Sequence, residues 1–261
     1  MAAIGPPDKE DKEALASIYS EDARALCREV VAARGETWLT AEELSRVLNA
    51  FGLPLAPSGM ARSEAEAVAT ASIIGFPVVL KIGAPGLVHK AGVGGVRLNL
   101  PTEPAVEAAF RDIAKRFPEV RQAGAASAVF VQPMLAGVET TIGLTEDPPS
   151  GPLVTFGLGG VDTGLVREMV SRRAPLLDRD ADALMQSARG YPLLQGHRGR
   201  PPADLDALRD VILRVSLLGD RIPEVRELDL NPVMALPAGH GCRVVDARAR
   251  VGPASRQDQL A

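Results

Sequence analysis

Pro77-Val-Val-Leu-Lys-Ile82 is the stretch that decides the fold of this chain, because this apolar, β-branched run predicts a strand. Side chains alternate along a strand, so the apolar residues at positions 78, 80 and 82 share one face and Lys81 points to the other. An unpaired ammonium group is costly to bury among apolar side chains. Two interpretations stay open: Lys81 reaches water from the end of the strand, or it is a fixed cation for a phosphate group.

A glycine-studded loop, residues 83–95, follows this strand. Glycine-rich backbone can approach an anion closely and offer it N–H donors. The loop also carries His89 and Lys90, in a chain that has only three histidines. A lone loop histidine is usually a surface residue, but one beside a lysine and a glycine cluster favours phosphate chemistry, since an imidazole can accept a phosphoryl group. The glycines of the cluster are Gly92, Gly94 and Gly95.

A second polar pattern lies in Glu227-Leu-Asp-Leu-Asn-Pro232, where acidic or amide side chains alternate with leucines. Glu227, Asp229 and Asn231 therefore share one face of a predicted strand, while the two leucines face a core. Asp246 follows on the next predicted strand. Oxygen ligands on two neighbouring strands suit Mg²⁺, which takes one or two protein carboxylates together with nucleotide phosphates. The alternative is the polar outer face of an antiparallel pair.

Strand and helix patterns mix along the chain without a strict strand–helix–strand rhythm. This mixture predicts an α+β fold with antiparallel sheets rather than a doubly wound parallel sheet. Two helix starts carry capping signals, Thr40 with Glu43 and Ser63 with Glu66. The expected helices are 9–34, 40–52, 63–75, 103–117, 178–189 and 204–219, and the expected strands are 76–82, 96–100, 128–132, 139–144, 152–156, 225–236 and 243–250.

The composition is that of an ordinary globular protein. The 261 residues carry a net charge of −4, whereas a nucleic-acid or membrane-surface partner would favour a basic excess, so neither is expected. No apolar run approaches the roughly 18 residues that span a bilayer, and the start of the chain has no apolar signal segment. Two isolated cysteines, Cys27 and Cys242, fit a reducing compartment. We therefore expect a cytoplasmic protein.

The common nucleotide-binding motifs are missing from the sequence. It contains no G-x-x-x-x-G-K-[ST], and Gly157-x-Gly159 lacks the third glycine of the dinucleotide fingerprint because Asp162 stands there. Neither a P-loop protein nor a Rossmann domain is expected.

Taken in order, the motifs resemble the ATP-grasp domain of the ADP-forming acyl-CoA synthetases, such as the β subunit of ADP-forming acetate–CoA ligase. The resemblance covers about residues 36–250 and is specific because many moderate motifs stand in register. They are Leu39-Thr-Ala-Glu-Glu-Leu44, Phe51-Gly-Leu-Pro54, Gly75-Phe-Pro-Val-Val-Leu-Lys81, Val88-His-Lys-Ala-Gly-Val-Gly-Gly-Val96, Val131-Gln-Pro-Met134, Phe156-Gly-Leu-Gly-Gly160, Gly190-Tyr-Pro-Leu-Leu-Gln-Gly-His-Arg-Gly199, Glu227-Leu-Asp-Leu-Asn-Pro232 and Asp246-Ala-Arg248.

The resemblance implies an ATP site. Lys81 would contact the phosphates under a flexible glycine lid, a hinge segment would meet adenine through its backbone, and Glu139 would hold the ribose hydroxyls. Arg198 is a further phosphate-binding candidate, with a structural role in its loop as the alternative. The lid glycines would be Gly92, Gly94 and Gly95, and the hinge would be Gln132, Pro133 and Met134.

The same resemblance implies metal-binding and phosphate-transfer residues. Asn231 and Asp246 would hold Mg²⁺, with Asp229 near them. His89 matches the histidine that, in this family, is thought to carry phosphate transiently between the nucleotide site and the partner subunit. Lys90 would steady the phosphate in transit.

The resemblance also implies a domain plan of two α+β lobes that grip ATP between them. We expect a helical extension over 1–35 and an ATP-grasp domain over 36–250, followed by a tail over 251–261. The ATP-grasp domain would consist of an N-terminal part, 36–132, and a C-terminal metal-binding lobe, 133–250. One departure stands out: Gly164 occupies the position of a family glutamate, and Glu168 that of an aspartate.

The implied activity is that of the β subunit of an ADP-forming acid–CoA ligase, which needs a CoA-binding α subunit and is expected to assemble as α₂β₂. One alternative is a non-catalytic ATP-sensing module that regulates an acyltransferase partner; Gly164 favours it, while the intact His89 loop does not. Another is an ATP-grasp carboxylate–amine ligase, which would not need the lid histidine. The choice of acid is expected to reside in the partner.

Overall fold

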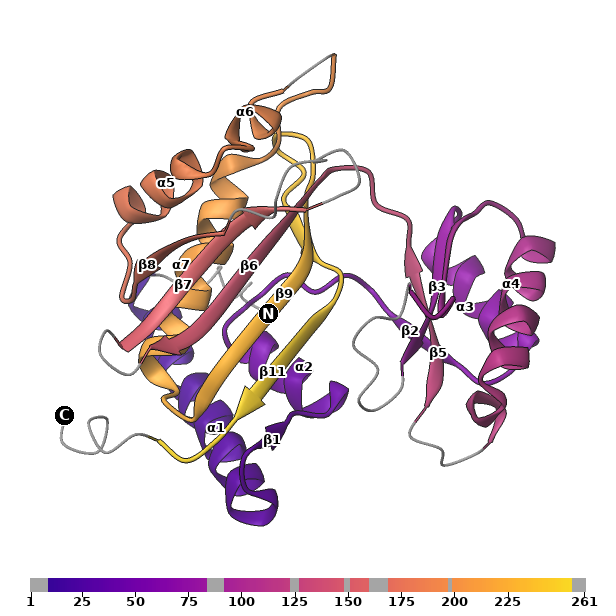
Figure 1. Ribbon diagram of the computed structural model, residues 1–261, viewed down its shortest axis with the longest axis horizontal. Coiled ribbons are helices and arrows are strands. Elements are labelled where there is room, and N and C mark those ends of the chain that lie inside the picture. Colours follow the sequence, from indigo (N-terminus) through magenta and orange to yellow (C-terminus); the bar gives the residue numbers. More distant parts are fainter. Residues whose placement is uncertain are drawn as a thin grey trace, which may run out of the picture. The chain divides into compact units, whose positions relative to one another are not determined.

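The computed structural model describes residues 9–83, 92–122, 127–147, 151–159, 169–196 and 199–254, with side chains described from Ser20 onward. The chain divides into two compact units, drawn in Figure 1 in colours that follow the sequence. The larger unit contains residues 1–55 and 137–261, and the smaller unit contains residues 56–136.

The larger unit is built on a seven-stranded sheet whose strand pairs are all antiparallel (Figure 1). Its strands are β1 (Thr37–Trp38), β6 (Val138–Asp147), β7 (Gly151–Leu158), β8 (Val170–Arg173), β9 (Val225–Ala235), β10 (Cys242–Val244) and β11 (Ala247–Val251). They lie in the order β1-β11-β9-β6-β7-β8, with β10 paired to β9. The predicted antiparallel α+β fold is therefore confirmed in this unit.

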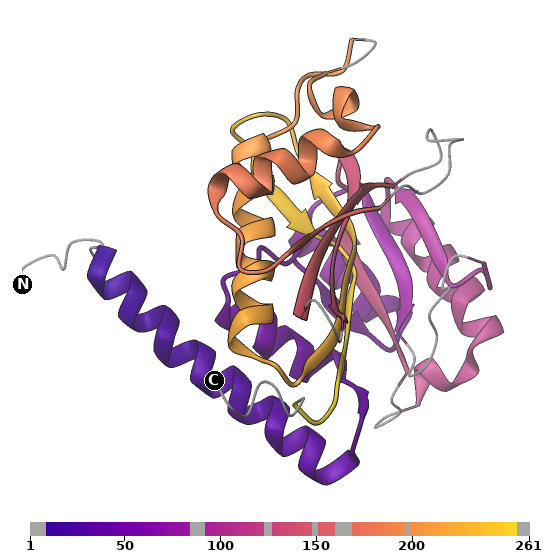
Figure 2. The ribbon, with the colours of Figure 1, turned by 60° about the vertical axis from the view of Figure 1, so that its left-hand side comes forward.

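Helices cover one face of the larger sheet, and Figure 2 shows the helix of residues 205–221 lying against the strands. This helix, α7, buries Leu208, Ile212 and Val215 in the same core as Ile142 and Leu144 of β6. Polar side chains are thereby left on the opposite face. The helices of this unit are α1 (Lys9–Arg34), α2 (Ala41–Ala50), α5 (Asp178–Ser187), α6 (Tyr191–Leu194) and α7 (Leu205–Arg221).

The N-terminal segment is part of the core of the larger unit. Helix α1 spans the predicted residues and ends before Gly35, whose φ of +68° suits glycine. It packs on α2 (Figure 2) and contributes Leu26, Cys27 and Val30 to the same core. The sequence placed residues 36–55 with the N-terminal part of the ATP-grasp domain. They instead pack with the larger unit, because α2 buries its apolar face there.

The smaller unit is a four-stranded antiparallel sheet with two helices on one face (Figure 1). The helices bury Phe110 and Ile113 against Val78, Leu80 and Ile82 of the sheet. Its elements are β2 (Gly59–Ala61), α3 (Glu64–Ile74), β3 (Val78–Gly83), β4 (Val96–Leu100), α4 (Glu103–Arg116), the 3₁₀ turn η1 (Pro118–Arg121) and β5 (Ala128–Pro133), with the strand order β2-β5-β3-β4.

The predicted helix starts are confirmed, but the two caps differ. The Thr40 hydroxyl accepts a hydrogen bond from the Glu43 N–H at 3.3 Å, and the Glu43 carboxylate accepts one from the Thr40 N–H at 2.8 Å, which completes a capping box. Ser63 likewise caps the N–H of Glu66 at 3.2 Å. The Glu66 carboxylate, however, accepts from the Arg62 N–H at 2.7 Å, so this second cap is not a reciprocal box.

Most predicted elements are present within a few residues of their expected bounds, whereas the short elements β1, β2, β8 and α6 were not predicted. Two further differences lie at the end of the chain. The strand expected over 243–250 is divided into β10 and β11. The expected tail begins too early, because Val251 completes β11 and is fully buried, and the Gly252 N–H donates to the Glu224 carbonyl at 2.8 Å. Within the described part of the chain, no helix is long and apolar enough to cross a membrane.

Candidate functional site

Lys81 lies on the open face of the smaller sheet. Along β3 the side chains of Val78, Leu80 and Ile82 are fully buried under the helices, while Lys81 is half-buried on the other face, as alternation predicted. Its Cα pairs with Val96 on β4 and with a β5 residue on the other side. The lysine therefore lies inside the sheet between two neighbours, and not at a frayed strand end.

The C-terminal end of the glycine-rich loop is anchored to β3. The Gly95 carbonyl accepts a hydrogen bond from the Ile82 N–H at 2.8 Å, and the Gly94 carbonyl accepts one from Arg97 at 2.8 Å. Gly94 has a φ of +70°, which side chains rarely adopt. Gly92, Gly94 and Gly95 thus lead directly into β4 beside Lys81, whereas His89 and Lys90 lie outside the described residues.

The predicted adenine-binding segment lies at the end of β5. Gln132 pairs with Val79 of β3 and is buried, and Pro133 pairs with Val78. The Met134 N–H donates to the Pro77 carbonyl at 2.9 Å, so a contact from Met134 to a purine would come from its carbonyl or its half-exposed side chain.

Glu139 lies near the start of β6 in the larger unit. Its carbonyl accepts a hydrogen bond from the Gly159 N–H at 2.9 Å. Its side chain lies beside Gly159, within 3.9 Å of where a Cβ of that glycine would stand. The carboxylate is exposed next to the first residue of the Gly159-Gly160 pair. Arg198, Gly164 and Glu168 lie outside the described residues.

Asn231 and Asp246 are neighbours on adjoining segments of the larger sheet. The Asn231 N–H donates to the Asp246 carbonyl at 2.9 Å, directly beyond the last register pair of β9 and β11, Leu230 with Ala247. Glu227, Asp229 and Asn231 alternate with fully buried leucines along β9, as the sequence predicted. The Asp246 carboxylate accepts from the Ala247 N–H at 3.1 Å.

Asp229, the third predicted metal residue, is engaged by an arginine. Its Oδ2 lies 3.1 Å from Nε of Arg248, which stands directly opposite it on β11. The Arg248 guanidinium also lies 5.2 Å from the ring of Trp38 on β1. The sequence pattern Asp246-Ala-Arg248 predicted no role for Arg248. The available signal was its spacing of two residues from Asp246 on an extended segment.

The oxygen donors fit Mg²⁺ better than a transition metal. Among the described residues no group of three or more His, Cys, Asp or Glu side chains comes together as a metal site. An asparagine and an aspartate offer hard oxygen donors, and Mg²⁺ is usually held by one or two protein carboxylates while nucleotide phosphates complete its coordination. Asn231 and Asp246 are the residues that would hold it.

Neither thiol can serve as a nucleophile in this fold. Cys27 and Cys242 are buried in the core of the larger unit. Burial raises the pKa of each thiol from 9.0 to about 12. A thiolate is therefore not available near neutral pH.

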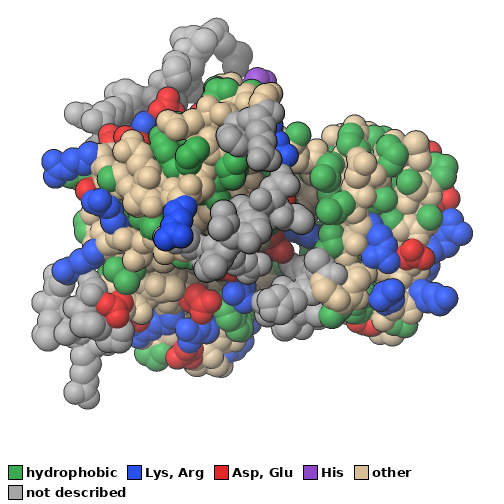
Figure 3. Space-filling view, turned by 45° about the horizontal axis from the view of Figure 1, so that its top comes forward, with side chains coloured by type: hydrophobic (Ala, Val, Ile, Leu, Met, Phe, Trp, Pro, Cys, Tyr) green, Lys and Arg blue, Asp and Glu red, His purple; other side chains and the backbone are tan. Residues whose placement is uncertain are grey.

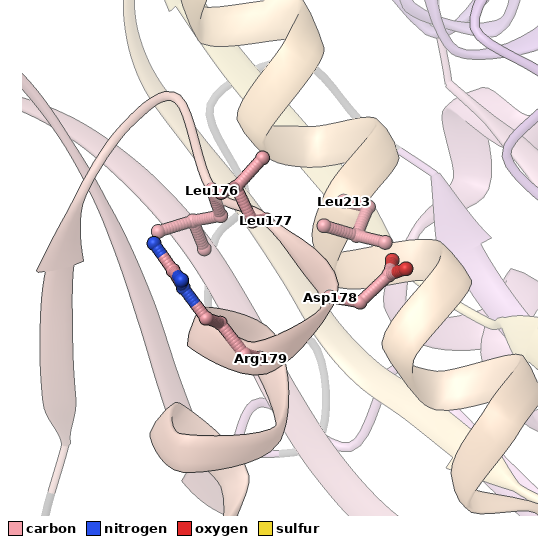
Figure 4. A pocket seen from close by; sticks show the side chains of 5 residues that line it. All are labelled: Leu176, Leu177, Asp178, Arg179 and Leu213. Carbon is pink, nitrogen blue, oxygen red and sulfur yellow. The ribbon is translucent and has the colours of Figure 1, made fainter.

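Neither the surface charge nor the hollow described below points to site residues beyond those predicted from the sequence. On the face shown in Figure 3, acidic and basic side chains are interspersed over the larger unit. A shallow hollow beside α7 is lined by none of the predicted residues (Figure 4). Its lining is Leu176, Leu177, Asp178, Arg179 and Leu213.

The predicted residues thus form two sets, one on each unit. The smaller unit holds Lys81, the lid glycines and the Gln132–Met134 segment, and the larger unit holds Glu139, Asp229, Asn231 and Asp246. Within each unit the residues lie on neighbouring strands.

Comparison with known proteins identifies the family. A model of the ATP-grasp domain matches residues 30–251. The chain is 36% identical over 222 residues to the acetate–CoA ligase [ADP-forming] II subunit beta of Pyrococcus furiosus, covering 84% of this chain and 94% of that protein. It is 40% identical over 249 residues to the acetate–CoA ligase [ADP-forming] I of Archaeoglobus fulgidus, covering 94% of this chain and 35% of that protein.

A third relative, the 4-hydroxybutyrate–CoA ligase [ADP-forming] of Nitrosopumilus maritimus, is 39% identical over 211 residues, which are 80% of this chain and 30% of that protein. The chain therefore spans about a third of the length of the first curated relatives it matches.

Solved structures agree with this assignment. The dinucleotide forming acetyl-coenzyme A synthetase 1 of Ca. Korarchaeum cryptofilum, in complex with coenzyme A, Ca-AMPCP and HgCl⁺, has a TM-score of 0.76 at 40% identity, with 88% of this chain and 99% of that chain covered. A second structure of that protein, with coenzyme A and Mg-AMPPCP and a phosphohistidine segment pointing towards the nucleotide binding site, has a TM-score of 0.70 at 38% identity over the same shares of both chains. The chain therefore belongs to the ATP-grasp family, in the group that includes the separate β subunits of the ADP-forming acetate–CoA ligases.

Proposed function

We propose that this chain is the nucleotide-binding subunit of an ADP-forming acyl-CoA ligase, which binds ATP or ADP with Mg²⁺ and exchanges the terminal phosphate with a CoA-binding α subunit. The observation that carries the proposal is the match over 94% of a separate β subunit. The chain also keeps Lys81 on the open face of the smaller sheet and the Asn231–Asp246 pair on the larger sheet.

Charge neutralisation and positioning dominate phosphoryl transfer, and the residues of the two units divide this work. Lys81 binds the phosphates as a cation at a defined position, because β4 and β5 pair with β3 on both sides of it and hold its backbone in the sheet. Gly92, Gly94 and Gly95 let the loop backbone approach the phosphates and exclude water. Asn231 and Asp246 hold Mg²⁺, which when bound neutralises charge that develops on the phosphate oxygens.

The transfer step uses His89 as the phosphoryl acceptor. A neutral imidazole nitrogen attacks the γ-phosphorus, a P–N bond forms, and the bond from that phosphorus to the bridging oxygen breaks. The electron pair leaves with ADP, and the ring N–H gives its proton to solvent, so that the phosphohistidine ring is neutral. Lys90 steadies the phosphate while it passes to the partner. These two roles rest on the family resemblance.

In this proposal the CoA and acyl chemistry is assigned to a partner subunit. The net reaction is acyl-CoA with ADP and phosphate giving acid, CoA and ATP, reversibly. We propose that the CoA and acyl sites belong to an α subunit in an α₂β₂ assembly, and that the purified chain alone does not ligate CoA to an acid.

The test is phosphate transfer from ATP labelled at its γ position, measured on the chain with and without its α subunit. His89→Ala is expected to lose labelling and turnover while it still binds ATP, because the acceptor nitrogen is removed. His240→Ala is the matched control, since His240 is an exposed histidine in a turn of the larger unit. This variant should leave labelling and turnover unchanged.

Other outcomes of this labelling experiment would favour a second candidate function. Gly164, at the position of a family glutamate, favours a non-catalytic ATP-sensing module as the second candidate. ATP binding by the unaltered chain without any transfer to His89 would support that candidate. Full turnover by His89→Ala would contradict the phosphohistidine relay.

A further inference from the structure

A ladder of alternating charges runs along the open face of the larger sheet towards the Asn231–Asp246 pair. Arg250 contacts Glu36 and lies 3.4 Å from Glu227. Arg248 lies 3.9 Å from the same Glu227 and 3.1 Å from Asp229. The ladder therefore ends on Asp229, two residues before Asn231 on β9.

Arg248 is held on more than one side. Asp229 lies directly opposite Arg248 in the register of β9 and β11 and pairs with its guanidinium, and Glu227 forms a second ion pair with it. The ring of Trp38 lies against the same guanidinium, with 5.2 Å from Cζ to the ring centre. Single exposed ion pairs contribute little, but a guanidinium fixed by a ring and two carboxylates has a defined position.

The position of the Arg248 guanidinium determines how strongly the Asp229 carboxylate can attract a cation. Asp229 and Asn231 share a face of β9, and Arg248 stands two residues after Asp246. A carboxylate in contact with a guanidinium attracts a divalent cation weakly, because the cation meets the fixed positive charge as well. Nucleotide phosphates would bring their own negative charge to the same place.

We propose that Arg248 is a positioning residue that withholds Asp229 from the magnesium site, so that the divalent cation binds together with the nucleotide and not before it. The inference rests on the proposed function, since it takes Asn231 and Asp246 as the magnesium ligands. It adds that Asp229 stays outside the ligand set in the intact chain.

The test is binding of Mn²⁺ without nucleotide, followed by electron paramagnetic resonance of the free ion. Arg248→Gln is expected to bind Mn²⁺ at least about tenfold more tightly than the unaltered chain, because Asp229 is released. Arg250→Gln is the matched control: it removes the next arginine of the same ladder, which also contacts Glu227, and should bind Mn²⁺ as the unaltered chain does.

A double variant, Arg248→Gln with Asp229→Asn, keeps the net charge and removes the pair. It should return nucleotide-free Mn²⁺ binding to the unaltered level and keep the Mn²⁺–ATP affinity within about threefold. An unchanged affinity in Arg248→Gln overturns the inference, as does a gain that persists in the double variant. Loss of Mn²⁺–ATP binding in the double variant also overturns it, because Asp229 would then be a ligand in the intact chain.

The Mn²⁺–ATP measurement on the unaltered chain separates this inference from the proposed function. If the unaltered chain does not bind Mn²⁺–ATP, the proposed function fails and the inference fails with it. If the unaltered chain binds Mn²⁺–ATP and Arg248→Gln does not bind nucleotide-free Mn²⁺ more tightly, only the inference fails.

Discussion

Lys81 stands on the open face of the smaller sheet because its two β3 neighbours in sequence, Leu80 and Ile82, fill the core beneath it. Period-2 alternation makes this placement readable from the sequence. The same rule placed Asp229 and Asn231 together. It could not reveal that Asp229 is held by Arg248, because that contact depends on the register between β9 and β11, which no local pattern specifies.

Replacing Lys81 tests the phosphate contact directly. Lys81→Met keeps most of the stem and removes the charge, so ATP affinity should fall about 10- to 100-fold, the range expected for a charge-assisted hydrogen bond. Isothermal titration with Mg²⁺–ATP measures it. Lys115→Met, at an exposed position in the last turn of α4, is the control and should bind ATP normally. Equal affinities for both variants would remove Lys81 from the site.

At the scale of elements, Asp204 joins helix α7 to the turn between β9 and β10. Its carboxylate accepts hydrogen bonds from the Ala207 N–H at 3.1 Å, the Gly241 N–H at 2.9 Å and the Gly239 N–H at 3.0 Å. These bonds, the one from Ala207 first, lower the pKa of the carboxyl below its ordinary 3.8. The charged form is therefore stabilised in the folded chain.

The Asp204→Asn variant should lose about 1–3 kcal/mol of unfolding free energy at pH 7, because in either orientation its amide N–H₂ would face at least one backbone N–H donor. A carboxyl with a lowered pKa stabilises the fold above its ordinary pKa and loses that contribution as the pH falls through the folded value. The difference between the two chains should therefore narrow below about pH 4.

Urea unfolding between pH 3 and 7 measures this difference. Asp206→Asn, at an 86% exposed carboxylate in the same first turn of α7, is the control and should change stability by less than about 0.5 kcal/mol. A constant difference across the pH range would show that the Asp204 charge does not stabilise the fold.

Long elements were predictable and very short ones were not. Helix α1 and strands β3, β4 and β5 have enough residues to show a period, and their predicted bounds agree with the structure within two residues. Strands β1, β2 and β8 contain two to four residues, which is too few for alternation to be visible. They form because a longer strand offers them a partner.

At the scale of the whole molecule, the sequence could not reveal that residues 1–55 pack with residues 137–261, since this pairing joins distant segments. Helix α1 carries part of that core. It also holds the buried Glu224 through Arg24 at 3.2 Å and Arg28 at 2.9 Å. The larger unit is therefore expected to depend on its N-terminal helix.

Deletion of residues 1–35 should destabilise the larger unit. Leu26 and Val30 alone represent about 3–6 kcal/mol of buried apolar surface. Fluorescence of Trp38, the single tryptophan of the chain, reports urea unfolding of this unit, and its midpoint should fall. Hydrogen exchange in β3 and β5 of the smaller unit serves as the internal control and should be unchanged. An unaltered Trp38 midpoint would show that α1 is dispensable.

The central claim of the proposed function is that Lys81 and the Asn231–Asp246 pair bind the phosphates of the same nucleotide. The most direct test is a crystal structure of the chain with Mg²⁺ and a non-hydrolysable ATP analogue. The predicted result is Lys81 on the phosphates and the same phosphates sharing a metal ion with Asn231 and Asp246. A nucleotide that contacts only one unit, with Lys81 and the Asn231–Asp246 pair on separate surfaces, would contradict it.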